Sequence, residues 1–190
     1  MNRVVHTGVV SLALLVPVLS EAKPAPVPAE VDTATHFNIR MGTATTDDNG
    51  RPSLCLELAL WHKVSVEGCG TGSGVLHEDE GGEMAHFRAK WTAWTERVGR
   101  GSLLVQPGVG FAELELSRDE PGFQFGSPDG TSAAGAEGAL SLQYLMPLQR
   151  GLELVASTAM GVAYIRGARE LPGSPSRTQT FASLELGVGW

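Results

Sequence analysis

The last twelve residues of the chain alternate between two kinds of side chain, and this pattern constrains the fold more than any other feature. One set is apolar apart from its first member and consists of Thr180, Ala182, Leu184, Leu186, Val188 and Trp190. The other set is mostly polar or glycine and consists of Gln179, Phe181, Ser183, Glu185, Gly187 and Gly189. Side chains of a β-strand point alternately to its two faces, so the segment is predicted to be a strand with one apolar face.

The same period of two recurs in six segments upstream. They lie at 37–41, 54–61, 86–93, 103–112, 139–148 and 152–164. The segments 152–164 and 179–190 span 13 and 12 residues, whereas strands of globular proteins average about 5 to 6 residues and a tilted membrane strand needs about 9 to 11. These lengths favour an all-β fold that crosses a bilayer. Leu114 and Leu116 change the phase of their segment, which predicts a β-bulge or the rim of the fold.

The connections between the segments fall into two classes. Short connections are expected at 47–52, 96–101 and 148–151, and long polar ones at 64–83, 117–135 and 167–176. Bacterial barrels have short periplasmic turns, longer outer loops and an even number of strands. Seven segments therefore require an eighth strand, within either 64–74 or 30–35. A C-terminus on the periplasmic side would make the strand after His36 run inward, which favours a strand within 30–35.

Together these segments resemble the small outer-membrane β-barrel proteins of Gram-negative bacteria, the eight-stranded group that includes OmpA, OmpX and OmpW. The resemblance covers 36–190 and rests on the alternation and on the closing segment TFASLELGVGW, which ends in an aromatic residue. It implies an antiparallel up-and-down β-barrel of eight strands in contact with outer-membrane lipid. It also implies an assembly signal for the barrel-assembly machinery, carried by Leu184, Leu186, Val188 and Trp190. An ordinary core strand that ends the chain is the alternative for the same residues.

The N-terminus has the features of a secretory signal peptide. Arg3 supplies a basic start, 8–19 form an uncharged apolar run, and Ser20 and Ala22 place small residues at the two positions that a signal peptidase reads. That run is shorter than the roughly 20 residues of a membrane-spanning helix. We expect a signal peptide at 1–22, an extended Pro- and Ala-rich leader at 23–35, and a single β-barrel domain at 36–190.

The composition limits the classes of partner. The chain has a formal net charge of −7, and its 14 lysines and arginines do not cluster, which excludes nucleic acid as an expected partner. Its 24 glycines and 11 prolines favour strands and turns over helices. No cofactor is expected.

If the apolar faces meet lipid, the opposite faces of the strands point into a narrow lumen. Those faces carry Arg40, Glu57, Lys63, Arg88, Lys90, Glu137, Glu153 and Glu185. The interior of an eight-stranded barrel is just wide enough for side chains, so we expect these charges to pair into a polar plug without an open pore. A soluble periplasmic barrel or sandwich that binds a small apolar ligand is the alternative, and it would place the leucine and valine faces inside.

Two cysteines, Cys55 and Cys69, form an even pair that predicts a disulfide in an oxidising compartment. A simple extended path argues against the bridge, because it would carry the two residues tens of ångströms apart. The chain after Trp61 would have to fold back for the disulfide to form.

The remaining polar motifs indicate loops. The segment 77–86 (HEDEGGEMAH) matches no calcium or zinc spacing and is predicted to be a solvated acidic loop, so no metal site is expected. The segment 68–74 (GCGTGSG) matches no nucleophile or phosphate motif. Trp91, Tyr144, Tyr164 and Trp190 are expected in interfacial aromatic girdles, and Trp94 is expected to fill the interior.

These patterns predict an outer-membrane barrel, not an enzyme, with a structural or surface-interaction role. The soluble ligand-binding protein is the second hypothesis for function. An outer-membrane lipid-modifying enzyme is the third, although the neighbourhood of His86 lacks the signature of such enzymes.

Overall fold

A computed structural model describes residues 36–47, 50–72, 82–116 and 131–190 of the chain. The signal peptide and leader predicted at 1–35 lie outside these residues. Within the described residues the elements are β1 Phe37–Ala44, β2 Ser53–Trp61, β3 Val64–Gly70, β4 Glu83–Trp91, β5 Trp94–Val98, β6 Gly101–Glu115, β7 Ser132–Pro147, β8 Glu153–Tyr164, the 3-10 helix η1 Arg166–Glu170 and β9 Thr178–Gly189. In the same part of the chain, no helix has the length and apolarity needed to cross a bilayer.

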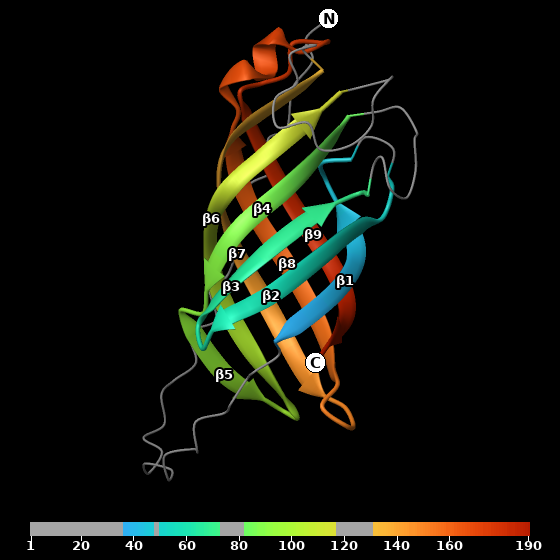
Figure 1. Ribbon diagram of the computed structural model, residues 1–190, viewed down its shortest axis with the longest axis vertical. Helices are drawn as coiled ribbons and strands as arrows, with labels where there is room; N and C mark the ends of the chain where they lie inside the picture. Colours follow the sequence, from blue (N-terminus) through green and yellow to red (C-terminus); the bar gives the residue numbers. More distant parts are fainter. Residues whose placement is uncertain (1–35, 48–49, 73–81, 117–130) are drawn as a thin grey trace, which may run out of the picture. The chain divides into compact units, whose positions relative to one another are not determined.

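The strands form one closed antiparallel sheet. Neighbours follow the order β4, β3, β2, β1, β9, β8, β7, β6, and an additional pairing between β4 and β6 closes the ring (Figure 1). The short strand β5 follows β4 after two residues and pairs only with the first part of β6, from Trp94 opposite Val105 to Val98 opposite Gly101. The predicted all-β, eight-stranded, up-and-down barrel is confirmed, with β5 as an extension at one end.

The two faces of the sheet have opposite polarity, and this decides which way the barrel is turned. Apolar side chains on the outer face are widely exposed, including Met41, Val109, Met160, Leu184 and Leu186, each at 56% or more. The charged side chains on the inner face are buried. A soluble barrel would have the reverse arrangement, because its apolar sets would form the core. The outer face is therefore suited to lipid.

The eighth strand of the closed ring is β3, which falls within 64–74, the less favoured of the two predicted positions. The favoured position, 30–35, lies outside the described residues. The two-residue turn His62–Lys63 folds the chain back after β2, and Val64 lies opposite Trp61 at the start of the pairing. The count of seven strands lacks β3, so it also predicts the wrong direction for β1, which was expected to run inward. The backbone N–H of His36 donates to the carbonyl oxygen of Trp190 at 3.0 Å, so β1 starts at the end of the barrel where β9 finishes.

This strand order redistributes the connections between the two ends. The end that holds Trp190 carries the turns at 62–63, 99–100 and 148–152, and we call it the near rim. The opposite end, the far rim, carries the connections 45–52, 71–82, 116–131 and 165–177. The short connection 47–52 therefore lies with the long connections, contrary to the sequence-based assignment. Likewise 64–70 and 132–135 belong to strands, so the long loops are shorter than expected.

The phase change near Leu114 marks the far rim, and the bulge alternative is wrong. The register of β6 and β7 is continuous from Ser102 opposite Leu145 to Glu115 opposite Ser132. Leu114 keeps its inward direction and is 8% exposed, because the interior is apolar at this end. The apolar cluster there consists of Met84, Ala112, Leu114, Ala133, Ala163, Ile165, Ala168, Leu171 and Phe181.

The seam between β4 and β6 depends on a glycine, which generates a prediction. A Cβ atom on Gly110 would overlap the carbonyl oxygen of Phe87, whereas a Cβ on Gly138 would meet no atom within 4 Å. We expect Gly110→Ala to lose about 3 kcal/mol or more of stability, because a backbone atom cannot rotate away as a side chain can. The measurement is the folded fraction on a gel with and without boiling. Gly138→Ala is the control, and an equal loss in both variants would contradict this account of the seam.

Candidate functional site

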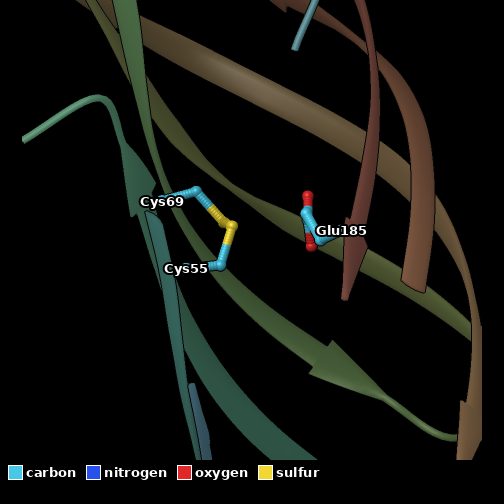
Figure 2. Close-up of side chains that lie close together, drawn as sticks. All are labelled: Cys55, Cys69 and Glu185. Atoms are coloured by element: carbon cyan, nitrogen blue, oxygen red, sulfur yellow. A yellow bond between two sulfur atoms is a disulfide. The ribbon is translucent and has the colours of Figure 1, made fainter. Parts of the chain in front are cut away.

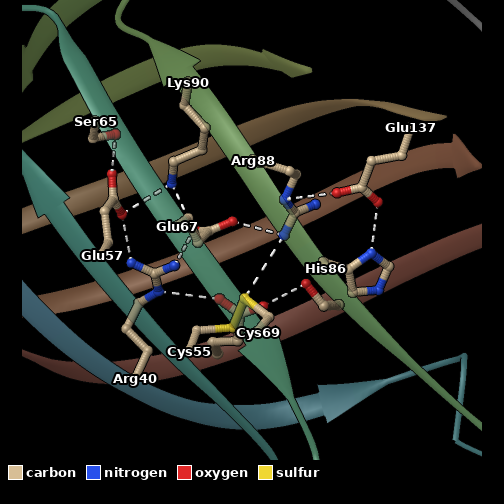
Figure 3. A network of polar contacts seen from close by, with 12 residues as sticks. Arg40, Cys55, Glu57, Ser65, Glu67, Cys69, His86, Arg88, Lys90 and Glu137 are labelled. Atoms are coloured by element: carbon tan, nitrogen blue, oxygen red, sulfur yellow. Dashed lines mark hydrogen bonds and ion pairs between the residues drawn. A yellow bond between two sulfur atoms is a disulfide. The ribbon is translucent and has the colours of Figure 1, made fainter. Parts of the chain in front are cut away.

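The interior of the barrel contains a group of seven buried charged side chains, which we call the lumen network. Their side chains reach the same space because each occupies an inward position of its strand, and Figure 3 labels all of them except Glu185. Each is 6% exposed or less. The cations are Arg40 on β1 and Arg88 and Lys90 on β4, and the carboxylates are Glu57 on β2, Glu67 on β3, Glu137 on β7 and Glu185 on β9.

Arg40 is the centre of the lumen network. Its Nη1 donates to Glu57 Oε2 at 2.6 Å and its Nε donates to Glu185 Oε2 at 3.0 Å. Its Nη2 donates to Glu67, and its Nη1 also donates to Asn38. The planar guanidinium offers five N–H groups in a fixed fork, which suits a residue that must serve carboxylates from three strands. The side chain is fully buried, so these contacts replace its hydration.

Two of the carboxylates face each other directly, and cations bridge them. Glu57 and Glu67 are register partners on β2 and β3, where like charges repel. Lys90 Nζ lies 2.9 Å from Glu57 Oε2 and 2.7 Å from Glu67 Oε2, and Arg40 contacts both residues from the other side. The two carboxylates can therefore remain ionised side by side.

Neutral side chains satisfy the remaining acceptor capacity of Glu57. The hydroxyl of Ser65 donates to Oε1 at 2.6 Å, and the amide of Gln143 donates to Oε2 at 2.9 Å. The amide of Asn38 adds a longer hydrogen bond of 3.2 Å to Oε2. A buried charge is tolerated when both pairing and hydrogen bonding compensate for its lost water, and Glu57 meets both conditions.

A second group of contacts connects the lumen network to the apolar cluster of the far rim. Arg88 Nη2 lies 2.7 Å from Glu67 Oε1, and its guanidinium carbon is 5.4 Å from the centre of the Phe181 ring. His86 Nδ1 and Glu137 Oε2 are 2.7 Å apart, and the centres of the His86 and Phe181 rings are 4.4 Å apart. The polar and apolar halves of the interior are therefore packed against each other through His86, Arg88 and Phe181.

The structure joins Cys55 and Cys69 in a disulfide (Figure 2). The two residues lie directly opposite each other on β2 and β3, because the turn at 62–63 folds the chain back as the bridge requires. The path argument against the disulfide therefore fails. Donor atoms of Cys55, Cys69 and Glu185 lie within 4.8 Å of one another. Sulfur atoms joined in a disulfide are not the thiolates that metals bind, so this trio does not form a metal centre.

Two residues predicted for the lumen network lie elsewhere. Lys63 is exposed because it belongs to the turn between β2 and β3 and not to a strand. Glu153 is half-buried at the first position of β8, near the rim, and lies outside the group of contacting charges. Trp94 was expected inside the barrel, but it is 48% exposed on β5, which extends beyond the closed ring.

Sequence reasoning missed several members of the interior. Glu67 and Ser65 fall within the predicted long connection 64–83, where a strand within 64–74 is only the second choice, although Val64 and Val66 alternate with them as in a strand. His86 and Gln143 occupy inward positions of predicted strands. They are absent from the predicted lumen set, which contains only arginine, lysine and glutamate. The alternation of side chains along each strand, which places both residues on the same face as the predicted charges, is the signal that identifies them.

The remaining space in this part of the interior is small. A cavity of about 10 Å³ lies on the far-rim side of the lumen network, next to Cys55, His86, Arg88 and Phe181. A buried water needs about 10 to 15 Å³ by this measure, so the cavity has room for about one water molecule. The side chains therefore occupy nearly all of this region.

Comparisons with known proteins add little to the geometry. Neither a protein-family model nor a curated protein sequence matches the chain. Among solved structures, the chain is similar to Ail, the attachment invasion locus protein of Yersinia pestis, with 13% identity and a TM-score of 0.31, over 80% of this chain and 93% of that one. The strand pairing and the polarity of the two faces carry the assignment. The chain has the fold of the small outer-membrane β-barrel proteins.

Removal of Arg40 tests the lumen network. We expect Arg40→Met to reduce the free energy of unfolding by about 3 to 5 kcal/mol, because it leaves the carboxylates of Glu57, Glu67 and Glu185 buried with fewer cations. The measurement is urea unfolding of the barrel in detergent or lipid vesicles, followed by tryptophan fluorescence. Lys63→Met is the control, because it removes a charge of the same sign at an exposed turn. Equal shifts in both variants would refute the central position of Arg40.

The disulfide generates a separate prediction. Cysteine-specific labelling of the unfolded protein should succeed only after reduction. The double variant Cys55→Ser, Cys69→Ser should have a free energy of unfolding about 3 kcal/mol lower than that of the native protein. This is the stabilisation expected from a disulfide that closes a loop of about 15 residues. Free thiols in the unreduced protein would exclude the bridge.

Proposed function

We propose that this protein is a closed outer-membrane barrel with a structural or surface-interaction role, and that it neither conducts solutes nor catalyses a reaction. The observation that carries the proposal is the placement of the charges. Seven charged side chains fill the middle of the lumen, while leucine, valine and methionine side chains cover the outside. Such an arrangement is stable only with lipid around the barrel.

The packed lumen supports the absence of a pore. Arg40, Lys90 and their carboxylate partners come from five strands and meet across the barrel. Ions passing through would have to break several buried ion pairs, each costly to separate in a medium of low dielectric constant. The far-rim cluster adds an apolar layer above the charges, which water does not readily enter.

The connections of the far rim are the surface proposed for interaction. All four of them, 45–52, 71–82, 116–131 and 165–177, are longer than any turn of the near rim. The described connection 165–177 carries the exposed side chains Arg166, Arg169, Glu170 and Arg177, which give it a positive balance within an acidic chain. Loops on a rigid scaffold are the usual location of binding surfaces.

The outer face also supports the proposed assembly partner. The exposed side of β9 and the residue after it carry the predicted assembly signal, Leu184, Leu186, Val188 and Trp190. The centres of the Trp190 ring and the Phe37 ring on β1 are 5.0 Å apart. Recognition of these residues by the barrel-assembly machinery stays a prediction. The lipid-modifying enzyme is less well supported, because His86 is 5% exposed and the cavity beside it is far too small for an acyl chain.

Cell fractionation and bilayer recording test the proposal. We expect the protein in the outer-membrane fraction, with a folded band that shifts on boiling, and no stepwise currents after insertion into planar bilayers. Recovery from the periplasm without detergent would refute the membrane location. Reproducible conductance steps, absent from mock preparations, would refute the closed lumen while leaving the location intact.

A further inference from the structure

A groove at the near rim lies outside the lumen network and the far-rim surface. It has a volume of about 410 Å³ and lies between the β5–β6 turn and the β7–β8 turn, which are adjacent because β6 pairs with β7. Its lining is mainly apolar, with one cation, and consists of Arg100, Met146, Pro147, Leu148, Gln149 and Leu152. A groove of this size can hold part of a small amphipathic molecule.

The groove is continuous with the lipid-facing surface of the barrel. Met146 is register partner of Leu154, and both belong to the outward set of their strands. Leu148 and Leu152 are 50% and 44% exposed at the β7–β8 turn. Exposed aromatic side chains occur at the same rim, among them Trp94 and Trp190. Aromatic residues of membrane barrels gather where the hydrocarbon meets the headgroups, so the groove lies at the level of the headgroups.

The charge of the near rim favours an anion at this level. The cations among its described residues are Lys63, Arg97, Arg100 and Arg150, and the carboxylates are Glu96 and Glu153. Counted over side chains alone, four cations and two carboxylates give this rim an excess of two positive charges, in a chain whose formal net charge is −7. Arginine near a membrane surface attracts anionic lipid, at about 1 kcal/mol for each side chain.

The near rim carries the short turns, which lie on the periplasmic side in bacterial barrels. We propose that its groove binds an anionic phospholipid of the periplasmic leaflet. Arg100 pairs with the phosphate through its guanidinium group, which matches phosphate oxygens in a bidentate manner. Met146, Leu148 and Leu152 contact the upper part of the acyl chains. The proposal rests on the proposed membrane location, and it adds a ligand site at the end of the barrel opposite the interaction surface.

A second copy of the chain is a weaker candidate for the occupant. Two copies of the barrel in one membrane would be related by an axis along the membrane normal. The free edges of their two β5 strands would then run in the same direction along this axis and cross, so they could not pair in antiparallel fashion. A free phosphate would use Arg100 but not the apolar lining. A phospholipid uses both.

Native mass spectrometry of the folded protein in a zwitterionic detergent tests the site. The probes are dimyristoyl phosphatidylglycerol, its phosphatidylcholine counterpart and inorganic phosphate. We expect stronger retention of phosphatidylglycerol than of phosphatidylcholine, with no displacement by millimolar phosphate. Arg100→Gln should weaken binding of phosphatidylglycerol about fivefold, the equivalent of one arginine at a membrane surface. Arg169→Gln, which removes an exposed arginine at the far rim, should leave binding unchanged.

Further variants separate the possible failures. Leu152→Asp should weaken the lipid adduct while the band shift on boiling shows that the barrel still folds. Equal binding by the protein and Arg100→Gln, equal losses in Arg100→Gln and Arg169→Gln, or displacement by inorganic phosphate would overturn the lipid site. None of these results would affect the membrane location, which fails only if the protein is soluble without detergent.

Discussion

The closure of the sheet between β4 and β6 is the constraint on which the rest of the structure depends. In a bilayer no water satisfies an exposed N–H or carbonyl group, so a spanning sheet must have no free edge in the hydrocarbon. With eight strands the ring is narrow, and its inward side chains must fit one another. The strand β5 lacks a second neighbour, and this is consistent with its position at the near rim, where water can serve its free edge.

Within this ring, pairing of charges replaces the apolar core of a soluble protein. Burying Arg40 or Glu57 alone would cost several kcal/mol, and only simultaneous contacts from neighbouring strands offset that cost. The arrangement is specific as well as stable, because a slip of one residue in β2 or β3 would turn Glu57 or Glu67 toward lipid. The disulfide between Cys55 and Cys69 holds the same two strands in register. The network and the disulfide thus specify one pairing of the hairpin.

Much of this arrangement was predictable from the alternation of side chains, and the errors have physical causes. Long strands such as β8 and β9 show a clear period, and a period of two places Arg40, Glu57 and Glu185 on one face without further information. Lipid and protein core are both apolar, however, so the pattern could not decide which face is inside. β3 shows no clear period because it is short and contains glycine at 68 and 70, so a strand within 64–74 is the less favoured of the two predicted positions. The count without β3 placed Lys63 in the network, left Glu67 out and inverted the direction of β1.

The two rims differ in a way that separates stability from interaction. At the far rim, η1 contributes Ala168 to the apolar cluster around Phe181, so the connection 165–177 is attached to the interior while its charged side chains remain exposed. The near rim has short turns above a smaller buried cluster of Leu104, Leu145 and Val155, to which none of those turns contributes a residue. Gly151 adopts a positive φ of 78° in the β7–β8 turn. A rigid barrel with an anchored far rim can display loops without transmitting motion into the lumen. Under the proposed surface-interaction role, variation in those loops changes the partner and leaves the lumen network intact.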